Sequence, residues 1–393
     1  MEVATCNIVA TFLLYLHMFV AAIITLSILL LWGDWVVYRR YISHCRFAWI
    51  RRAAAALLIT AHILPYIAIA ILQLFELPNM APVMWLTTIY ILLSLSRLAL
   101  YAGILIIKNR PAKWVIGVSL CTIVAWVLIV GVVRTRKEVT IKRCEIVSTQ
   151  LPKAFDGYRI AFFSDLHIGS MTSATDMCRK VVEHLNSLDA DLVVFGGDLI
   201  NVRYDELSPE IQNILGGVKA RDGVFAVLGN HDTGVYIHDT VAMPLAENTR
   251  LLKGRISQMG WQMLDDETVW LVRGKDSLSL TGIGFSHELL EHRHSANVAD
   301  SLDMRQIYEG VSCDKFNISV SHMPQLWRKI SSIGYGDLVL SGHVHAMQMK
   351  LQIGESKFSP SQLMYREWSG HYTEQNSHLY IQMAWVVLPF IFA

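Results

Sequence analysis

The sequence predicts a protein of two parts, an apolar helical region followed by an α/β domain. Hydrophobic residues make up 53% of the 393 residues and charged residues only 17%, and the apolar excess is concentrated in the first third. From Tyr158 onward, short apolar runs alternate with helical patterns, which is typical of βαβ units. Several of these short runs end in a carboxylate, an amide or an imidazole, which indicates a functional site at the ends of the strands.

Four apolar runs are each long enough to cross a bilayer, which takes about 20 helical residues. They cover residues 8–31, 53–75, 84–107 and 114–133. A signal peptide is a poor alternative for the first run, because its apolar core is long and three similar runs follow it. We therefore expect residues 1–133 to form a bundle of about four transmembrane helices in an integral membrane protein.

The basic residues of the connecting loops predict an orientation. The first and third loops are rich in Arg and Lys, whereas the second loop has neither. The positive-inside rule then places these two loops in the cytoplasm and the α/β domain outside it, at the plasma (inner) membrane. Five basic residues between 134 and 143 argue against this orientation, but charges that precede a long translocated domain count for less.

One charged residue, Arg97, falls near the middle of the third run, where a charge is costly. Two roles are open for it. In the first, Arg97 contacts an anionic lipid head group or lines a gated cavity. In the second, it is a structural residue whose side chain extends to the membrane interface or bonds neighbouring helices. His17 and His62 are expected to form interhelical hydrogen bonds.

Charge and cysteine content exclude other classes. The formal net charge of +1 implies no broad basic face, so we expect no nucleic-acid partner. The six cysteines include no C-x-x-C and no close pair, which argues against a zinc knuckle and a disulfide framework.

A basic, β-rich connector, residues 134–157, leads to the α/β domain, residues 158–393. Residues 287–311 are read as a solvated helix or, alternatively, as a loop over the site. The other expected elements are strand 160–163, helix 175–188, strand 192–195, a short helix capped by Ser208 and stopped by Gly216-Gly217, strand 224–228, a helix ending near Met259, an antiparallel stretch at 261–264, 268–272 and 277–281, and strands 317–320 and 338–340.

Five strands end in side chains that bind metals. Carboxylate, imidazole and amide groups without a thiolate suit a divalent transition metal such as Mn, Fe or Zn. In an extended D-x-H or H-x-H step, alternate side chains lie on one side, so both can reach a metal. Seven ligand-type side chains are enough for two ions about 3.5–4 Å apart that share a carboxylate. The strand ends are Asp165-x-His167, Asp198, Asn230-His231, His322 and His343-x-His345.

The series Asp165-Leu166-His167, Gly197-Asp198, Gly229-Asn230-His231-Asp232, His322 and Gly342-His343-Val344-His345 resembles the calcineurin-like metallophosphoesterases. The resemblance runs from about Tyr158 to Tyr380, and the presence of a membrane-attached amino-terminal region makes the chain most similar to the YkuE-like branch. It implies a four-layer fold of two packed β-sheets flanked by helices. It also implies two divalent ions, one bound by Asp165, His167 and His345, the other by Asn230, His322 and His343, with Asp198 bridging them.

The implied activity is the hydrolysis of a phosphate mono- or diester, of a lipid or lipid precursor, by a membrane-anchored enzyme. Two cations would lower the pKa of a bridging water to generate a hydroxide, and would offset the charge on the phosphoryl group. His231 is expected to protonate the leaving alkoxide or to stabilise the transition state. Asp232 is expected to orient His231, with a turn cap as the alternative. Asn201 contacts substrate or forms a turn, and His238, His371 and His378 are expected to be surface or loop residues.

Two segments depart from the family pattern. Ala346-Met347-Gln348 replaces the two glycines that many relatives carry before the glutamine, and the bulkier residues could narrow the site. The apolar end, residues 382–393, stands where relatives continue through a glycine-rich turn and another strand. Three explanations are open for this segment: it docks on the membrane, it fills a core position of the domain, or it results from a shifted reading frame. Because of this end, the alternative function is a catalytically weak binding or regulatory module tethered to the membrane. A transporter or sensor has less support.

Overall fold

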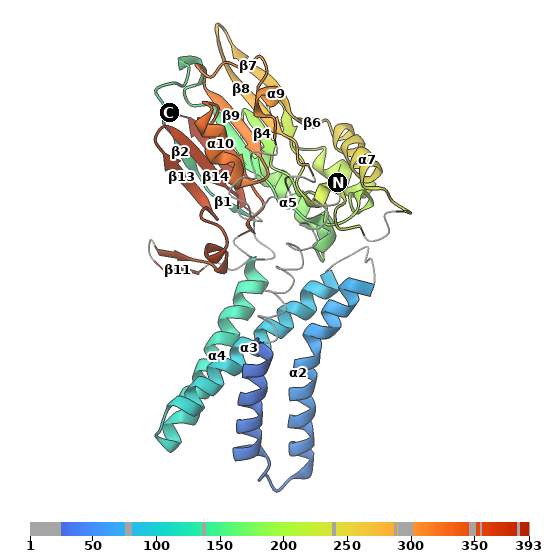
Figure 1. The fold of residues 1–393 in the computed structure, drawn as a ribbon, viewed down its shortest axis with the longest axis vertical. Helices are drawn as coiled ribbons and strands as arrows, with labels where there is room; N and C mark the ends of the chain where they lie inside the picture. The colour runs from blue at the N-terminus through green and yellow to red at the C-terminus, as the bar shows by residue number, and fades with distance from the viewer. Residues whose placement is uncertain are drawn as a thin grey trace. The chain divides into compact units, whose positions relative to one another are not determined.

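The computed structural model divides into two compact units, Met1–Lys137 and Glu138–Ala393, and we treat each by itself (Figure 1). Several predicted features lie outside the described residues, namely residues 8–24 of the first predicted span, His17, His238, Ala346–Gln348 and nearly all of 287–301. The structure describes residues 25–74, 81–135, 139–237, 241–286, 289, 302–345, 351–353, 356–382 and 386–392.

The first unit is helical wherever it is regular. Three of its helices are long and apolar enough to cross a membrane, with candidate spans at Ala48–Ala68, Ala81–Ile106 and Pro111–Val133. They overlap the three later spans predicted from the sequence. The described helices are residues 25–37, the π-helical turn η1 (Tyr38–Ile42), α2 (Ala48–Leu74), α3 (Ala81–Ile106) and α4 (Arg110–Thr135).

Arg97 is paired within this unit. Its Nη1 lies 2.9 Å from Oδ2 of Asp34, and Nε2 of His62 lies 2.7 Å from the same oxygen. The Tyr101 hydroxyl donates to Oδ1 of Asp34. These contacts support the structural role of Arg97, and they confirm His62 as an interhelical hydrogen-bonding group. Asp34 escaped the sequence analysis because it lies just beyond the first predicted span.

The second unit contains two main sheets. Strands β3 to β6 run parallel to one another, and the first sheet has the order β1-β15-β3-β4-β5-β6, with β2 also paired to β15. The second sheet has the order β13-β14-β10-β9-β8-β7. The strands are β1 (Thr140–Ile141), β2 (Cys144–Ile146), β3 (Arg159–Phe163), β4 (Leu192–Phe195), β5 (Val224–Ala226), β6 (Gln262–Met263), β7 (Glu267–Arg273), β8 (Asp276–Ile283), β9 (Asn317–Ser321), β10 (Leu338–Ser341), β11 (Leu351–Ile353), β12 (Ser356–Phe358), β13 (Gly370–Glu374), β14 (Ser377–Ile381) and β15 (Val386–Phe392).

Alternate residues of these strands pack on opposite faces of the sheets. Ile160 and Phe162 of β3 belong to the same buried cluster as Ile318 and Val320 of β9, so the two sheets pack face to face. The intervening residues of the strands pack with the helices in the other cluster. This is the predicted arrangement of two sheets with flanking helices. The helices are α5 (Ala174–Ser187), α6 (Pro209–Leu215), α7 (Leu245–Gln258), α9 (Met304–Ile307), α10 (Trp327–Ser332) and the 3-10 turns η2 (Lys153–Phe155), η3 (Ile168–Ser170), η4 (Tyr204–Glu206), η5 (His231–Thr233), η7 (Pro324–Leu326) and η9 (Pro360–Leu363).

Local predictions held for most elements. The Ser208 side chain caps α6 by accepting from the Ile211 N–H, and β7 and β8 form the expected antiparallel pair. The prediction that 261–264 joins this antiparallel stretch is wrong, because β6 pairs parallel with β5. The helix α7 lies between β5 and β6 in the chain, and such a crossover returns the chain in the parallel direction.

The apolar end of the chain forms part of the first sheet. β15 runs antiparallel to β3 and parallel to β1 and β2. Of the three roles considered for this segment, the structure supports the one in which it fills a position of the domain. Pro389 lies between the residues that pair with β1 and those that pair with β2. A proline has no N–H to donate, so it suits this break in the ladder.

Candidate metal centre

The predicted ligands converge from both sheets. Each follows the carboxyl end of a strand: β3, β4 and β5 in the first sheet, and β9 and β10 in the second. The carboxyl ends of neighbouring parallel strands meet at one edge of a sheet, so side chains that are distant in sequence become neighbours there. The residues brought together are Asp165, His167, Asp198, Asn230, His231, His322, His343 and His345.

One group of donors is formed by Asp165, His167, Asp198 and His345, with one ligand atom from each lying within 4.8 Å of all the others. Nε2 of His345 is 3.1 Å from Oδ1 of Asp165 and also 3.1 Å from Nε2 of His167. Nε2 of His167 is 3.5 Å from Oδ2 of Asp198. Separations of this size are those of neighbouring ligands around one ion.

A second group adjoins the first through Asp198. Nε2 of His322 lies 3.1 Å from Oδ2 of Asp198 and 3.2 Å from Oδ1 of Asn230. Nδ1 of His343 lies 2.9 Å from the same Asn230 oxygen. Asp198 therefore touches both groups, as a carboxylate shared between two ions must.

The backbone at these ligands is left-handed. The φ angles are 58° at Asp165, 45° at His167, 60° at Asp198, 73° at His343 and 52° at His345. The extended geometry predicted for the D-x-H and H-x-H steps is therefore wrong. Each such residue costs of the order of 1 kcal/mol, and hydrogen bonds such as Asp165 N–H to Gly197 O, 2.8 Å, hold the turns in place.

Two glycines allow the loops to approach this closely. A Cβ on Gly229 would collide with the Asp198 carboxylate, and one on Gly342 would lie 2.7 Å from the Ser164 hydroxyl and closer still to the Asp165 carboxylate. Larger residues would occupy the space into which the two carboxylates project. This is the physical reason for glycine before Asn230 and before His343.

Of the two roles considered for Asp232, the described contacts support the turn cap. Its carboxylate accepts backbone N–H groups of Asp198, Leu199, Ile200 and Gly229 at 2.7, 2.8, 3.1 and 2.9 Å. These bonds join the loop after β4 to the loop after β5. Asp232 therefore holds Asp198 in place and does not orient the His231 ring.

The His231 ring is oriented by Asn201 and Tyr236. Nδ1 of His231 lies 2.6 Å from the Asn201 carbonyl oxygen, and the ring stacks on Tyr236 with centroids 4.3 Å apart. Its edge contact with His167, at 4.5 Å between centroids, brings the ring to the donor group. Asn201 thus acts through its backbone, and the sequence carried no signal for Tyr236.

Glu206 is a second residue that the sequence analysis missed. Its carboxylate accepts the N–H groups of Asn201, Val202 and Arg203 at 2.5, 2.7 and 3.0 Å. It therefore fixes the loop that supplies the carbonyl to His231. No motif could have identified it, because its partners are backbone groups of a loop whose shape is not readable from residue types.

Burial and neighbouring charges set the protonation states. Burial disfavours ionisation of Asp165, but the His345 ring outweighs it and lowers the pKa of Asp165 to about 2. Burial likewise opposes ionisation of Asp198, yet His322 and His231 hold its pKa well below the usual range. Burial lowers the pKa of His167 and His343 to about 3 each. The carboxylates are thus ionised and these two imidazoles neutral at pH 7. Burial also opposes the charge on His322 and His345, but Asp198 raises the pKa of His322 to about 9 and Asp165 raises that of His345, so these two rings must release a proton when a metal binds.

The residues present fit divalent ions. The donors are oxygen and nitrogen only, and Nε2 of His343 is buried without a hydrogen-bond partner among the described residues. Lone pairs of the carboxylate, amide and imidazole groups converge here and would repel one another. A cation bound between them would accept these lone pairs and remove the repulsion. Such a set is compatible with Mn, Fe or Zn and does not select among them.

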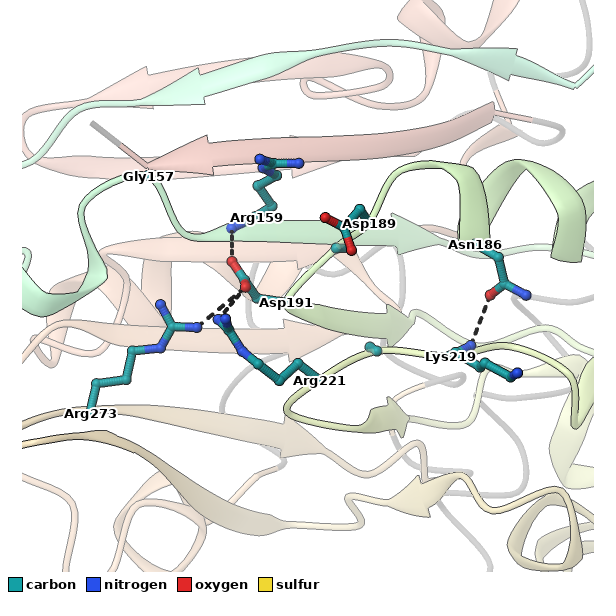
Figure 2. A pocket seen from close by; sticks show the side chains of 10 residues that line it. Gly157, Arg159, Asn186, Asp189, Asp191, Lys219, Arg221 and Arg273 are labelled. Carbon is teal, nitrogen blue, oxygen red and sulfur yellow. Dashed lines mark hydrogen bonds and ion pairs between the residues drawn. The ribbon is translucent and has the colours of Figure 1, made fainter.

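A separate pocket of about 660 Å³ lies at the opposite, amino ends of β3 and β4. Figure 2 shows Arg221 and Arg273 converging on Asp191, which also accepts the Arg159 N–H at 2.8 Å. The Asp191 carboxylate in this pocket is thus paired with two arginines. The pocket is distinct from the candidate metal centre.

Comparison with known proteins identifies the class. Residues 158–347 match the model of the calcineurin-like phosphoesterase family. The chain is 28% identical over 265 residues to the UDP-2,3-diacylglucosamine pyrophosphatase LpxG of Chlamydia trachomatis, covering 60% of this chain and 79% of that one. It is 28% identical over 242 residues to the uncharacterized metallophosphoesterase YkuE of Bacillus subtilis, covering 60% and 74%.

A third relative also has a membrane region by its name. The transmembrane protein with metallophosphoesterase domain of Danio rerio is 27% identical over 231 residues, covering 58% of this chain and 49% of that one. Residues 158–347 are therefore a calcineurin-like phosphoesterase domain, and the matches support a metal-dependent phosphoester hydrolase. The family uses a dinuclear metal centre, and the donor group described above is a candidate for it.

Proposed function

We propose that this protein is a membrane-anchored dinuclear-metal phosphoesterase that hydrolyses a phosphate mono- or diester of a lipid or lipid precursor. The observation that carries the proposal is the convergence of seven ligand-type side chains on one edge, with Asp198 in contact with both groups. The relative named as a UDP-2,3-diacylglucosamine pyrophosphatase supports an acylated, phosphate-containing substrate, although its name refers to a pyrophosphate bond.

The proposed division of ligands follows the two donor groups. Asp165, His167 and His345 would hold one divalent ion, Asn230, His322 and His343 the other, and Asp198 both. When bound, two such ions supply an activated water and offset phosphoryl charge. The chain's own contribution is to hold the two carboxylates ionised and His167 and His343 neutral in a buried, preorganised site.

His231 is the proposed acid for the leaving group. The Asn201 carbonyl accepts from Nδ1–H, which leaves Nε2 as the atom that exchanges a proton with substrate. Burial lowers the pKa of His231, so the free ring is neutral. A phosphate anion beside it would favour the imidazolium, and the proton would then pass from Nε2 to the departing alkoxide.

The proposed layout in the membrane follows the sequence. Residues 1–133 would anchor the enzyme, residues 134–157 would connect, and residues 158–393 would act outside the cytoplasm at the plasma (inner) membrane. The three candidate spans and the basic loop residues support this arrangement. The alternative of a catalytically weak module was based on the atypical residues 382–393. The pairing of β15 with β3 argues against that alternative.

The test uses the full chain purified in detergent with Mn²⁺ and two aryl esters whose leaving group benefits from protonation, phenyl phosphate and diphenyl phosphate. We expect metal-dependent turnover that falls about 10²–10⁴-fold in His231→Ala, with bound metal unchanged. Asp189→Asn, at an exposed residue outside the site, is the matched control and should keep full activity. Turnover that is the same with and without His231 would contradict the assigned role.

Lipid specificity is tested separately. We expect faster hydrolysis of an acylated phosphate ester in mixed micelles than of its water-soluble, deacylated counterpart at the same concentration. Equal turnover of the two would contradict a lipid substrate, while leaving the phosphoesterase proposal intact.

A further inference from the structure

The hairpin formed by β13 and β14 carries two histidines that the catalytic proposal does not use. β13 is at the edge of the second sheet. His371 pairs with Tyr380 and Thr373 pairs with His378, so the two histidines are diagonal neighbours on one face of the hairpin. His371 is exposed and His378 half-buried, and therefore both are within reach of a solute.

The donor atoms of these residues already have the spacing of metal ligands. Nε2 of His371 lies 2.9 Å from Nδ1 of His378, and the rings are 13° from parallel with centroids 5.2 Å apart. The Thr373 hydroxyl lies 3.4 Å from each of these nitrogens. Two imidazole nitrogens at about 2.0–2.1 Å from one ion, in adjacent positions, are themselves about 3 Å apart.

The protonation state also suits metal binding. Burial lowers the pKa of His371, and burial together with His371 lowers the pKa of His378. Both rings are therefore neutral at pH 7, with a lone pair available on each. The alternative is an N–H···N hydrogen bond between two neutral rings, in which the two nitrogens would be a similar distance apart. The experiment below distinguishes this hydrogen bond from metal binding.

This place is distinct from the candidate metal centre. His378 lies opposite Leu338, the first residue of β10, whereas the catalytic His343 follows the last residue of the same strand. At about 3.3 Å per residue, this puts the two places roughly 15 Å apart along the sheet.

We propose that His371 and His378 form a second, peripheral site for a borderline divalent ion such as Zn²⁺, Cu²⁺ or Ni²⁺. The Thr373 hydroxyl or water fills a third position. With two imidazole ligands the site leaves coordination positions open, so the ion exchanges readily and accepts a further ligand from solution. Binding joins β13 to β14, which stabilises the hairpin at the exposed edge of the sheet.

The test counts metal on the full chain in detergent after dialysis against a fixed free Zn²⁺ concentration. We expect total bound metal to fall by one equivalent per chain in His371→Ala/His378→Ala, while Mn²⁺-supported phosphoesterase activity is unchanged. The matched control is His184→Ala, at a half-exposed histidine of α5 whose Nδ1 contacts the Lys180 carbonyl, and it should keep the extra equivalent. Equal metal content in the wild type and the double variant would overturn the proposal.

The single variants His371→Gln and His378→Gln guard against a folding defect, because glutamine keeps a polar side chain on the strand. Zn²⁺ at the candidate metal centre stabilises all four proteins, so we expect a Zn²⁺-induced rise in the thermal midpoint that is larger in the wild type and in His184→Ala than in either glutamine variant. An identical Zn²⁺-induced rise in all four proteins would overturn the proposal and leave the hydrogen-bonded pair. Because metal content and thermal midpoint are read without turnover, this result is independent of the proposed enzymatic function.

Discussion

Each of the two units buries a cluster of carboxylate and imidazole groups, and the clusters differ in how their charge is balanced. In the first unit, the Asp34 carboxylate faces the Arg97 guanidinium at 2.9 Å, with His62 beside it. In the second unit, Asp165 and Asp198 contact imidazoles, a serine hydroxyl and backbone N–H groups, among the residues described. The same chemical group is therefore paired with a permanent cation in one place and with ionisable imidazoles in the other, where a bound metal can take the place of the imidazole protons.

This difference indicates how the role of a buried carboxylate can be inferred from its neighbours. A buried charge needs a partner, because isolating it from water costs several kcal/mol. Where an arginine supplies the opposite charge, the group stabilises the packing of helices. Where the contacts come from imidazoles and backbone N–H groups, with no arginine among the described residues, the group is available to a metal. The identity of the neighbours, more than burial itself, separates the two roles.

The largest effect is expected for the carboxylate shared by the two donor groups. Asp198→Asn removes the negative charge while keeping the shape, so we expect both ions to bind more weakly and turnover to fall by about 10³-fold or more. Metal analysis of the purified variant and turnover of an aryl phosphate check this. The control Asp189→Asn should retain metal and activity. Full metal occupancy with full turnover in Asp198→Asn would show that this carboxylate is not a ligand.

Removing the Asp34–Arg97 ion pair of the first unit should destabilise the folded protein without changing the candidate metal centre of the second unit. Arg97→Leu removes the guanidinium and leaves the buried Asp34 carboxylate with only His62 and Tyr101 as partners, so we expect a loss of up to about 3–5 kcal/mol in the free energy of unfolding. Thermal unfolding in detergent measures it. The double variant Asp34→Asn/Arg97→Leu removes the unpaired charge and should recover part of the loss. If Arg97→Leu and wild type unfold alike, the ion pair is not a determinant of stability.

Asp232 is an intermediate case, since backbone N–H groups balance its carboxylate. Asparagine has one acceptor oxygen for the four N–H groups, so Asp232→Asn should leave some of them unsatisfied. We expect a loss of about 2–4 kcal/mol in the free energy of unfolding together with weaker metal binding, because Asp198 is no longer held. Chemical denaturation of the metal-free protein isolates the first effect. Wild-type stability in this variant would mean that other groups hold the loops.

The smallest expected effect is the acid dependence of the metal-free protein. The pKa of Asp165 is about 2 in the folded chain, below its unfolded value of about 3.9. Its stabilisation is therefore fully present above about pH 5 and is lost as the pH falls through about 4 and 2, by about 2.6 kcal/mol in total. Unfolding free energies measured across this range in the presence of a chelator test it. Asp165→Asn should flatten this part of the profile, and an unchanged slope would contradict the assignment.

Much of the candidate site was predictable because its signals are local. A strand followed by Asp-x-His or His-x-His identifies both the element and its ligands, and the structure brings all seven predicted ligands together at one edge. The left-handed backbone at five of them was not predictable. Side-chain type does not reveal that a loop turns sharply, and the turn is held by hydrogen bonds from other strand ends, such as that from Asp165 N–H to the Gly197 carbonyl.

By itself, the sequence determined the composition of the site, the order of its motifs and the positions of three candidate spans. Each of these depends on residue type and short-range periodicity. Only the tertiary structure decided that Asp34 neutralises Arg97, that Asn201 and not Asp232 orients His231, and that the chain end completes a sheet beside β3. Those pairings join residues that are 30 to more than 200 positions apart. They are fixed by the packing of whole elements, which no local pattern records.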